Sequence, residues 1–462
     1  DSFTGKRGMK LWRHQIEALE YFKPRNYGAL YTKPGTGKTR IMLELIKSRD
    51  FKLTLITCPK KVCRVWPTEF NKHFRGNNYK ILDVSLYANE RKVTEVKKVL
   101  ELNKNIHLII VNNYDSVWRK PLRDFLLKIK LDCVICDESH RIKTPGSKVS
   151  RFLTLLGKRV PNRFLMTGTP LAQSPLDIYA QYRFLNPEIF GTNYAVFKER
   201  YANWIQVPGG FSMLNKSNPY KNLDELHEKM FSCAFMPEVE QNLPPVQDIL
   251  WEFDLPKKSE KYYKELKKEG VLELKEGVVD SGNVLAIITR LQQLTSGYLP
   301  TDEGIVEIDA ARKDSFRELL ESLPDGEPVV VFCRFRKDIK NCRRVVKDMG
   351  RKSSEISGVR DTSTNWYAGK TSVLVVQISA GSEGIDLTRA RYGVYYTKTQ
   401  ALWQYQQSRK RLHRPGQVRP TTFYHIVARM SKGRTIDEDI NQSLEDNENL
   451  IDAILRGGFL ES

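Results

Sequence analysis

The stretch GALYTKPGTGKTRIMLELIKS, residues 28–48, decides the fold, because a short apolar run, a glycine-rich turn and an amphipathic run follow one another directly. Residues 28–32 predict a buried strand, and residues 40–48 predict a helix. Glycines at such a junction let backbone N–H groups close around phosphates, and the helix N-terminus adds its positive dipole end. The order Gly-x-Gly-Lys-Thr at residues 35–39 therefore predicts a phosphate-binding loop rather than a glycine-rich turn beside a solvated lysine.

The side chains of this loop indicate how a nucleotide would be held. Lys38 would contact the β- and γ-phosphates, and the hydroxyl of Thr39 would bind Mg²⁺. The strict form of the pattern has Gly five residues before Gly37, where this chain has Thr32. This departure leaves the Gly-Lys-Thr chemistry intact, and we expect the nucleotide-binding loop to comprise Thr32, Lys33, Pro34, Gly35, Thr36, Gly37, Lys38, Thr39 and Arg40.

A second apolar run, CVICDESH at residues 133–140, ends in two carboxylates. Carboxylates at the end of a buried strand are costly unless a cation or hydrogen bonds compensate them. We expect Asp137 to bind Mg²⁺, directly or through water, and Glu138 to be the base that activates the attacking water. His140 would either couple this pair to the TGT at residues 167–169 or cap the next segment. About 100 residues after a phosphate loop, the pair predicts a nucleotide hydrolase.

The charge of the chain predicts a polyanionic partner. Lys and Arg number 75 against 55 Asp and Glu, so the formal net charge is +20. Such an excess favours nucleic acid, whose counterions the cations displace, with an anionic membrane surface as the competing partner. No apolar stretch approaches the roughly 20 residues that span a bilayer, and no secretory signal opens the chain. We therefore expect no membrane partner and an intracellular site, the cytoplasm of a bacterium or phage-infected host, or the nucleus of a eukaryote.

The cysteines predict free thiols in a reducing compartment, because their number is seven and their spacing forms no framework. Cys133 and Cys136 form a C-x-x-C within a strand-like run, which favours packing over a zinc or redox site. The length of 462 residues and a hydrophobic fraction of 40% allow roughly three domains with real cores.

Two sets of apolar runs without alternation predict two α/β domains, each with a parallel sheet covered on both faces. The first set is at residues 53–59, 106–112, 131–138 and 163–170, and the second at 328–335, 372–379, 391–397 and 421–428. Residues 185–284 between the sets are aromatic and charged. Phe197, Tyr201 and Trp204 form a helical stripe there, which favours a packed core over a base-stacking platform. Residues 257–269 predict a charged helix, and Gly277 and Gly282 predict a flexible joint.

In order, these segments resemble the motifs of superfamily-2 helicase-like ATPases, and most closely their Swi/Snf-type branch. In the first half the resemblance rests on LWRHQIEAL (11–19), CPKKVCRVWPTEF (58–70), IIVNNYDSVW (109–118), DESH (137–140), MTGTPLAQSPLDIYAQYRFLNP (166–187) and LHEKMFSCAFMPEVEQNLPP (226–245). In the second half it rests on VVVFCRFRKDI (329–339), SGV (357–359), VQISAGSEGIDLTRA (376–390) and QSRKRLHRPGQ (407–417). The double Arg usual in the branch's helical insertion is missing, so contacts assigned to it are not carried over.

The resemblance implies an α/β fold of two RecA-like domains, each a parallel sheet flanked by helices, with a helical insertion between them. We expect lobe 1 at residues 1–187, the insertion at 188–250, a linker at 251–284 and lobe 2 at 285–462. ATP with Mg²⁺ would bind in the cleft between the lobes, and Gln15 would read the adenine edge. Gly384 matches the nucleotide-contacting motif of lobe 2, and Asp386, where the branch more often has Asn, would suit the ribose.

The basic run QSRKRLHRPGQ would divide into two faces. An isolated charge run is most often a solvated helix face. On a helix, however, Gln407, Arg411 and Arg414 share one narrow arc, and the following proline should end the helix at Arg414. The resemblance implies catalytic roles for these three residues, with Arg411 and Arg414 facing ATP. Arg409 and Lys410 would then be ordinary surface or DNA-facing charges.

The resemblance further implies nucleic-acid backbone contacts, for each of which plain surface exposure is the alternative, by Lys60, Lys61, Asn113, Tyr114, Arg334 and Ser379. Together these features predict an ATP-dependent motor that translocates on double-stranded DNA. A strand-separating DNA or RNA helicase is the main alternative, although we identify no wedge for it. A scaffold with a dead nucleotide site is disfavoured by the joint presence of Lys38, Glu138, Arg411 and Arg414.

Overall fold

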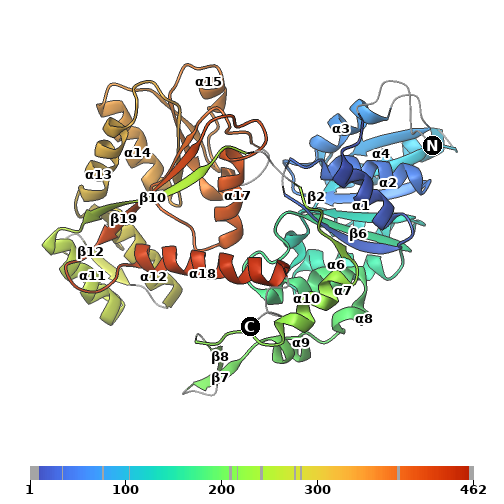
Figure 1. The fold of residues 1–462 in the computed structure, drawn as a ribbon, viewed down its shortest axis with the longest axis horizontal. Helices are drawn as coiled ribbons and strands as arrows, with labels where there is room; N and C mark the ends of the chain where they lie inside the picture. The colour runs from blue at the N-terminus through green and yellow to red at the C-terminus, as the bar shows by residue number, and fades with distance from the viewer. Residues whose placement is uncertain are drawn as a thin grey trace. The chain divides into compact units, whose positions relative to one another are not determined.

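The computed structural model describes residues 10–33, 35–74, 78–102, 105–207, 211–215, 217–239, 243–274, 277–280, 284–381 and 385–456. The chain divides into two compact units, one made of Asp1–Glu240 and Asn449–Ser462, the other of Gln241–Glu448 (Figure 1). Each unit contains one large parallel sheet with helices packed on it, as the two sets of apolar runs predict. No helix among the described residues is long and apolar enough to cross a membrane.

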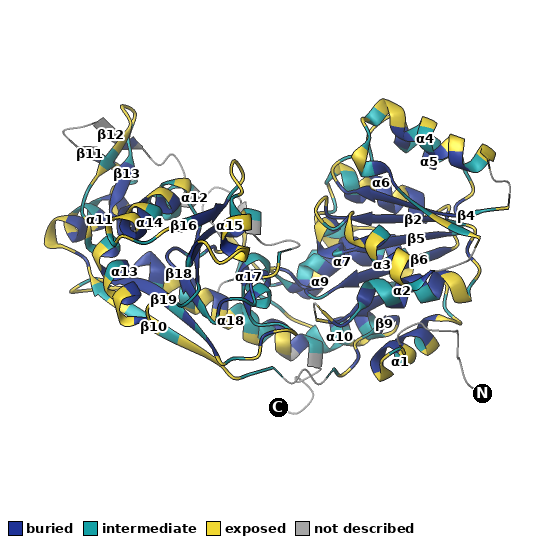
Figure 2. Cartoon of the chain, turned by 90° about the horizontal axis from the view of Figure 1, so that it is seen from above, coloured by how far each residue is buried: buried dark blue, intermediate teal, exposed yellow. Residues whose placement is uncertain are grey.

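The first unit has a seven-stranded sheet in which all strands are parallel, in the order β3-β4-β2-β5-β6-β1-β9. Its strands are β1 (Tyr27–Tyr31), β2 (Leu53–Cys58), β3 (Tyr79–Asp83), β4 (His107–Asn113), β5 (Cys133–Asp137), β6 (Asn162–Thr167) and β9 (Ala234–Phe235). The central strands are buried on both faces (Figure 2) because helices cover both sides, which explains their unbroken apolar runs.

The helices of this unit alternate with the strands up to β6 and then follow one another. They are α1 (Arg13–Phe22), α2 (Lys38–Ser48), α3 (Val65–His73), α4 (Asn89–Leu102), α5 (Leu122–Leu126), α6 (Lys148–Gly157), α7 (Ile178–Leu185), α8 (Pro187–Phe190), α9 (Tyr194–Tyr201) and α10 (Leu223–Phe231), with 3₁₀ turns at Val84–Leu86, Ser139–Ile142 and Pro175–Asp177. An antiparallel hairpin of β7 (Trp204–Val207) and β8 (Phe211–Leu214) follows α9.

The aromatic stripe after α8 is core in part only. Phe197 and Tyr201 are buried in α9 and pack on Tyr179 and Phe190. Trp204 lies beyond the end of the helix, in β7, and its side chain is 39% exposed. The prediction of a packed helical core is therefore confirmed for the first two residues and wrong for the third.

The second unit has a six-stranded parallel sheet in the order β10-β19-β18-β15-β17-β16. Its strands are β10 (Val246–Asp254), β15 (Val329–Cys333), β16 (Ser353–Ile356), β17 (Val373–Gln377), β18 (Tyr392–Tyr395) and β19 (Thr421–Arg429). Its helices are α11 (Lys257–Glu269), α12 (Val284–Thr295), α13 (Ala311–Ser322), α14 (Arg336–Asp348), α15 (Ser363–Tyr367), α16 (Ile378–Gly381), α17 (Leu402–Leu412) and the first part of α18 (Ile436–Arg456), up to Glu448. Two small hairpins, β11 (Val271–Leu274) with β12 (Gly277–Asp280) and β13 (Tyr298–Pro300) with β14 (Ile305–Glu307), complete it.

The division of the chain differs from the predicted bounds at the insertion, at the linker and at the C-terminal end. Residues 188–240 stay with the first unit and contain the β7–β8 hairpin as well as helices. β10 joins the second sheet, and α11, the expected charged helix, follows it, so residues 251–284 are not a simple linker. Gly277 pairs with Leu274 in a hairpin, which makes the predicted joint wrong there, and Gly282 lies outside the described residues. Residues 449–462 group with the first unit.

Candidate functional site

The predicted phosphate loop lies between β1 and α2, at the carboxyl edge of the first sheet. Gly37 caps α2 with a positive φ of 80°, which glycine adopts without strain, and a Cβ there would also clash with the amide of Gln15. The Lys38 ammonium is 8% exposed and donates to the carbonyl of Thr32, 3.0 Å away. The described residues of the loop thus surround a buried cation, and their binding of phosphate remains a prediction. Pro34 lies outside the described residues.

Gln15 and its neighbour hold the same loop from α1. The Gln15 amide donates to the carbonyl of Thr36 at 3.1 Å, and Nε2 of His14 lies 2.8 Å from that carbonyl. Gln15 Oε1 in turn accepts the backbone N–H of Trp12. Gln15 is therefore in contact with the predicted nucleotide loop. The contact of His14 with the loop was not predicted, although His14 lies in the same motif as Gln15.

Asp137 ends β5 as a buried carboxylate, 3% exposed. Burial and the adjacent charge of Glu138 raise its pKa to about 7, while the Lys38 ammonium opposes the rise. The indole N–H of Trp66 donates to its Oδ2 at 3.2 Å, and the Tyr114 hydroxyl donates to its backbone carbonyl at 2.7 Å. The cation of the loop and the carboxylate of β5 are therefore electrostatically coupled.

Glu138 stands in a strained conformation directly after the strand. Its φ of 53° is in the left-handed region, which costs a non-glycine residue energy and is concentrated at functional sites. The Thr167 hydroxyl donates to Glu138 Oε2 at 3.2 Å, and His140 Nδ1 lies 3.4 Å from the same oxygen. His140 Nδ1 also lies 3.3 Å from the Thr167 hydroxyl and 3.4 Å from that of Thr169. His140 therefore couples the carboxylate pair to the TGT segment, the first of the two roles considered for it.

The predicted nucleic-acid contacts of the first unit fall into two kinds. Lys60 and Lys61 are exposed in the turn between β2 and α3. Asn113 and Tyr114 are buried, and their polar side chains have intramolecular partners. The exposure of the two lysines is compatible with the predicted contacts to nucleic acid. The hydroxyl of Tyr114 instead donates to the backbone carbonyl of Asp137.

In the second unit, Arg334 donates to Gln292 and lies over the ring of Phe335, so its guanidinium is partly engaged. Ser379 is exposed in α16. Asp386 is exposed, and its Oδ1 accepts from the backbone and hydroxyl of Thr388 at 2.9 and 2.7 Å. Gly384 lies outside the described residues.

The helix of the final motif, α17, ends at Leu412, two residues earlier than predicted. His413 leaves the helix with φ −99° and ψ 89°, and its Nε2 lies 2.8 Å from the carbonyl of Pro244. Gln407 is buried on α17, and its Oε1 has no hydrogen-bond partner among the described residues. Arg411 is in the last turn of the helix, and Arg414 follows it. The catalytic roles of these three residues remain predictions.

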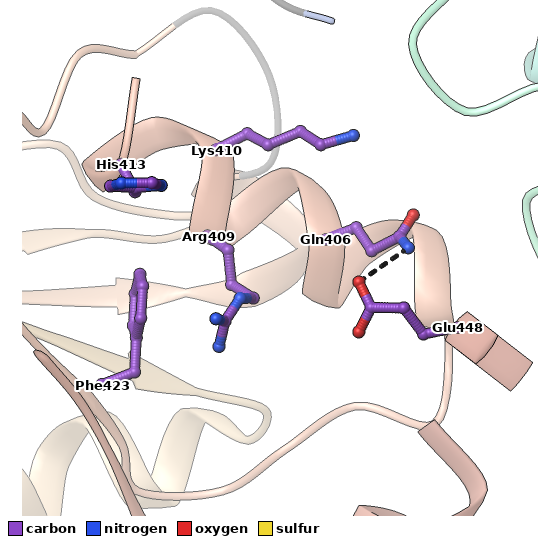
Figure 3. Close-up of a pocket in the computed structure, with 6 residues that line it drawn as sticks. All are labelled: Gln406, Arg409, Lys410, His413, Phe423 and Glu448. Atoms are coloured by element: carbon purple, nitrogen blue, oxygen red, sulfur yellow. Dashed lines mark hydrogen bonds between the residues drawn. The ribbon is translucent and has the colours of Figure 1, made fainter. Parts of the chain in front are cut away.

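Arg409 corrects the expected division of the basic run. Its guanidinium pairs with both carboxylate oxygens of Asp248 on β10, with Nη2 2.8 Å from Oδ2, and lies 4.4 Å from the centre of the Phe423 ring. Figure 3 shows Arg409 beside Phe423, while Lys410 extends away from them. The two cations border a pocket of about 160 Å³ together with Gln406, His413, Phe423 and Glu448. Arg409 is therefore not an ordinary surface charge, because Asp248 of β10 pairs with its guanidinium, whereas a contact of Arg409 with DNA remains a prediction.

The fold defines a class: an α/β protein of the helicase type with two large parallel sheets. The SNF2-related domain family matches residues 14–297, and the helicase conserved C-terminal domain matches residues 311–416. The chain therefore belongs to the SNF2-related family.

This chain is similar to one relative over nearly all of that relative's length, and to longer relatives over less than half of theirs. The chain is 25% identical to putative protein p41 of Acyrthosiphon pisum secondary endosymbiont phage 1, over 91% of this chain and 94% of the relative. It is 26% identical to the ISWI chromatin-remodeling complex ATPase ISW1 of Saccharomyces cerevisiae, over 93% of this chain and 40% of the relative. It spans a similar share, 41%, of an ATP-dependent helicase of Mycoplasma genitalium that is 24% identical over 96% of this chain. A solved SWI2/SNF2 ATPase core of Sulfolobus solfataricus in complex with dsDNA is 20% identical, with a TM-score of 0.44, and covers 97% of this chain and 93% of its own.

Proposed function

We propose that this protein is an ATP-driven motor that translocates on double-stranded DNA without separating its strands. The observation that carries the proposal is the coupled site of Lys38, Asp137 and Glu138 in a chain of the SNF2-related family. Relatives that match the chain over most of its length are named as a chromatin-remodeling ATPase and as DNA helicases. The excess of basic residues, with a net charge of +20, supports a nucleic-acid partner.

The donor groups of the site fit Mg²⁺. Thr39 supplies a hydroxyl and Asp137 a carboxylate, which are the hard oxygen ligands this ion prefers. A cation there would also offset the burial and the neighbouring charge of Glu138 that raise the pKa of Asp137. We assign the ion to Thr39 and Asp137, where it would neutralise charge on the β- and γ-phosphate oxygens of ATP.

The protein groups divide the remaining work. Lys38 would bind the β- and γ-phosphates, and Glu138, oriented by Thr167 and His140, would position and deprotonate the attacking water. We assign to Arg411 and Arg414 the stabilisation of charge on the transferring phosphoryl group, a role worth about 10³–10⁵ in rate in other nucleotide hydrolases. Phosphate-backbone contacts by Lys60, Lys61 and other exposed groups would carry no base specificity.

We place this activity inside a bacterial or phage-infected cell, because one relative that the chain covers to 94% of its length is a phage protein.

Displacement of a third DNA strand from a duplex tests the proposal. With ATP, the protein should displace a triplex-forming strand from a linear duplex and leave a plain forked duplex annealed. Lys38→Ala removes the cation that we assign to phosphate binding. This variant should no longer displace the third strand, although it should still bind the duplex. Efficient unwinding of the fork with no triplex displacement would instead establish a strand-separating helicase.

A further inference from the structure

Cys58 and Cys63 form a close pair of thiols that the proposed hydrolysis mechanism does not use. Cys58 ends β2, and Cys63 lies in the turn that leads into α3. Both side chains are fully buried, and their sulfur atoms are 3.4 Å apart. A disulfide bond is about 2.05 Å long, so the two sulfur atoms need to approach by only about 1.3 Å to form one.

The surroundings of Cys63 are polar. Asp83 accepts hydrogen bonds from the backbone and hydroxyl of Ser85, at 2.9 and 2.6 Å, and the Ser85 side chain also bonds Cys63. The buried ammonium of Lys92 interacts with the Cys63 sulfur and donates to the Ser116 hydroxyl at 2.6 Å. Because the Ser85 hydroxyl already donates its proton to Asp83, the Lys92 ammonium is the group that would stabilise a thiolate at Cys63.

The two thiols of the pair differ in acidity. The hydrogen bond from Cys58 lowers the pKa of Cys63, while burial and the charge of Asp83 oppose this shift. The same shared hydrogen bond and then burial raise the pKa of Cys58 well above its ordinary value. Because the thiolate is the reactive form of cysteine, Cys63 is the nucleophile of the pair, and Cys58 is the thiol that resolves it.

A second buried pair, Cys333 and Cys342 in the other unit, provides an internal comparison. Their sulfur atoms are 3.7 Å apart, and both side chains are fully buried in the apolar core of that unit. Burial is the main cause that raises the pKa of each thiol. This pair matches the first in distance and burial but has no acidic member.

We propose that Cys58 and Cys63 are a reversible redox-modification site, at which a hydroperoxide converts the two thiols into a disulfide. The Cys63 thiolate attacks one oxygen of hydrogen peroxide, the O–O bond breaks, and the departing hydroxide takes a proton to become water. Cys58 sulfur then attacks the resulting sulfenic acid, its S–H proton leaves with the hydroxyl as a second water, and the S–S bond forms. In total the two sulfur atoms lose two electrons and the peroxide gains them.

The position of the pair connects its oxidation to the hydrolysis site. The residues between the two cysteines include Lys60 and Lys61, the exposed predicted DNA contacts, and Trp66, the partner of Asp137, follows Cys63 by three positions. The carbonyl of Cys58 also accepts the backbone N–H of Tyr114, whose hydroxyl holds Asp137. Drawing Cys63 towards Cys58 would move the start of α3 and weaken the Trp66–Asp137 hydrogen bond. Oxidation should therefore inhibit the motor, a consequence that rests on the proposed function.

Peptide mapping of the full chain tests the modification itself. The native protein is treated with hydrogen peroxide, quenched with catalase, denatured in iodoacetamide and digested with trypsin. The site predicts a disulfide-linked pair of peptides, residues 53–60 with residues 62–64. The matched control pair, residues 318–334 with residues 341–343, should be found only as alkylated single peptides. Alkylated Cys58 and Cys63 without the linked pair, or equal linkage of both cysteine pairs, would overturn the proposal.

ATP hydrolysis tests the consequence. Oxidised protein should hydrolyse ATP about tenfold more slowly, the effect of losing one hydrogen bond to a charged group, and dithiothreitol should restore the rate. Cys63→Ser should be insensitive to peroxide, whereas the matched variant Cys342→Ser should respond like the wild type. Unchanged hydrolysis by a protein with the mapped disulfide would refute the inhibition. Reduced protein without ATPase activity would refute the proposed motor, while the peptide map would still decide the disulfide.

Discussion

Replacing Arg409 by methionine should destabilise the second unit by about 2–3 kcal/mol without weakening DNA binding. Methionine keeps much of the apolar stem of the side chain but removes the guanidinium that pairs with Asp248 and lies over Phe423. The Arg409 side chain is 18% exposed and that of Asp248 44%, so the pair is neither a surface nor a fully buried one. Exposed ion pairs contribute about 0–1 kcal/mol to stability, and breaking a buried ion pair costs about 3–5 kcal/mol. We therefore expect the loss of this bidentate, partly buried pair to cost an intermediate free energy.

Differential scanning calorimetry measures this loss directly. For a unit of about 200 residues, 2–3 kcal/mol corresponds to a fall of about 4–12 °C in the melting temperature of the second unit. The substitution Lys340→Met, at an exposed position of α14, removes an equal charge and should change stability by less than about 0.5 kcal/mol. Adding Asp248→Asn to Arg409→Met should cost less than the sum of the single changes. An unchanged melting temperature with a large loss of duplex affinity would show that Arg409 faces DNA, and the reasoning would be wrong.

Further predictions concern the two units separately. Glu138→Gln should lower the ATPase rate about 10²–10⁴-fold with ATP affinity kept, because the base is lost, as steady-state kinetics and nucleotide titration would show. Trp66→Phe should reduce the rate about tenfold or more, because it removes a hydrogen bond to Asp137, and a normal rate would exclude that role. Arg414→Ala should abolish hydrolysis and leave DNA affinity nearly intact; normal hydrolysis with lost DNA binding would reverse its assignment. Burial, and then the charge of Arg409, lower the pKa of Lys398 to about 7. As the pH rises from 7 to 9, the folded chain loses the proton of Lys398 while the unfolded chain keeps it, so the wild type should gain about 2 kcal/mol of stability relative to Lys398→Met in urea unfolding.

The parts of the fold that were predictable are those that are covered on both faces. All eight unbroken apolar runs contain strands of the two sheets, because a strand buried on both sides cannot alternate. β10 escaped prediction because it is an edge strand whose exposed and half-buried residues alternate. β16, SSEI, is too short and polar to be recognised. Because β10 was not recognised, residues 246–254 were divided between a predicted insertion and a predicted linker, although they form the first strand of the second sheet.

The site shows the same limit. The glycines, Lys38, Asp137 and Glu138 were predictable because their chemistry depends on local order along the chain. The roles of Trp66 and Tyr114 towards Asp137 were not, since each joins residues that are distant in sequence. The ion pair of Arg409 likewise depends on a partner 161 positions away.

The ATPase rate with no nucleic acid, double-stranded DNA, single-stranded DNA or RNA tests the central claim most directly. Double-stranded DNA should stimulate ATP hydrolysis well beyond single-stranded DNA or RNA. Lys38→Ala should remove the ATPase activity in every condition. Stimulation by single-stranded DNA or RNA alone would contradict the claim of a duplex-tracking motor, and hydrolysis that survives in Lys38→Ala would contradict the assigned site.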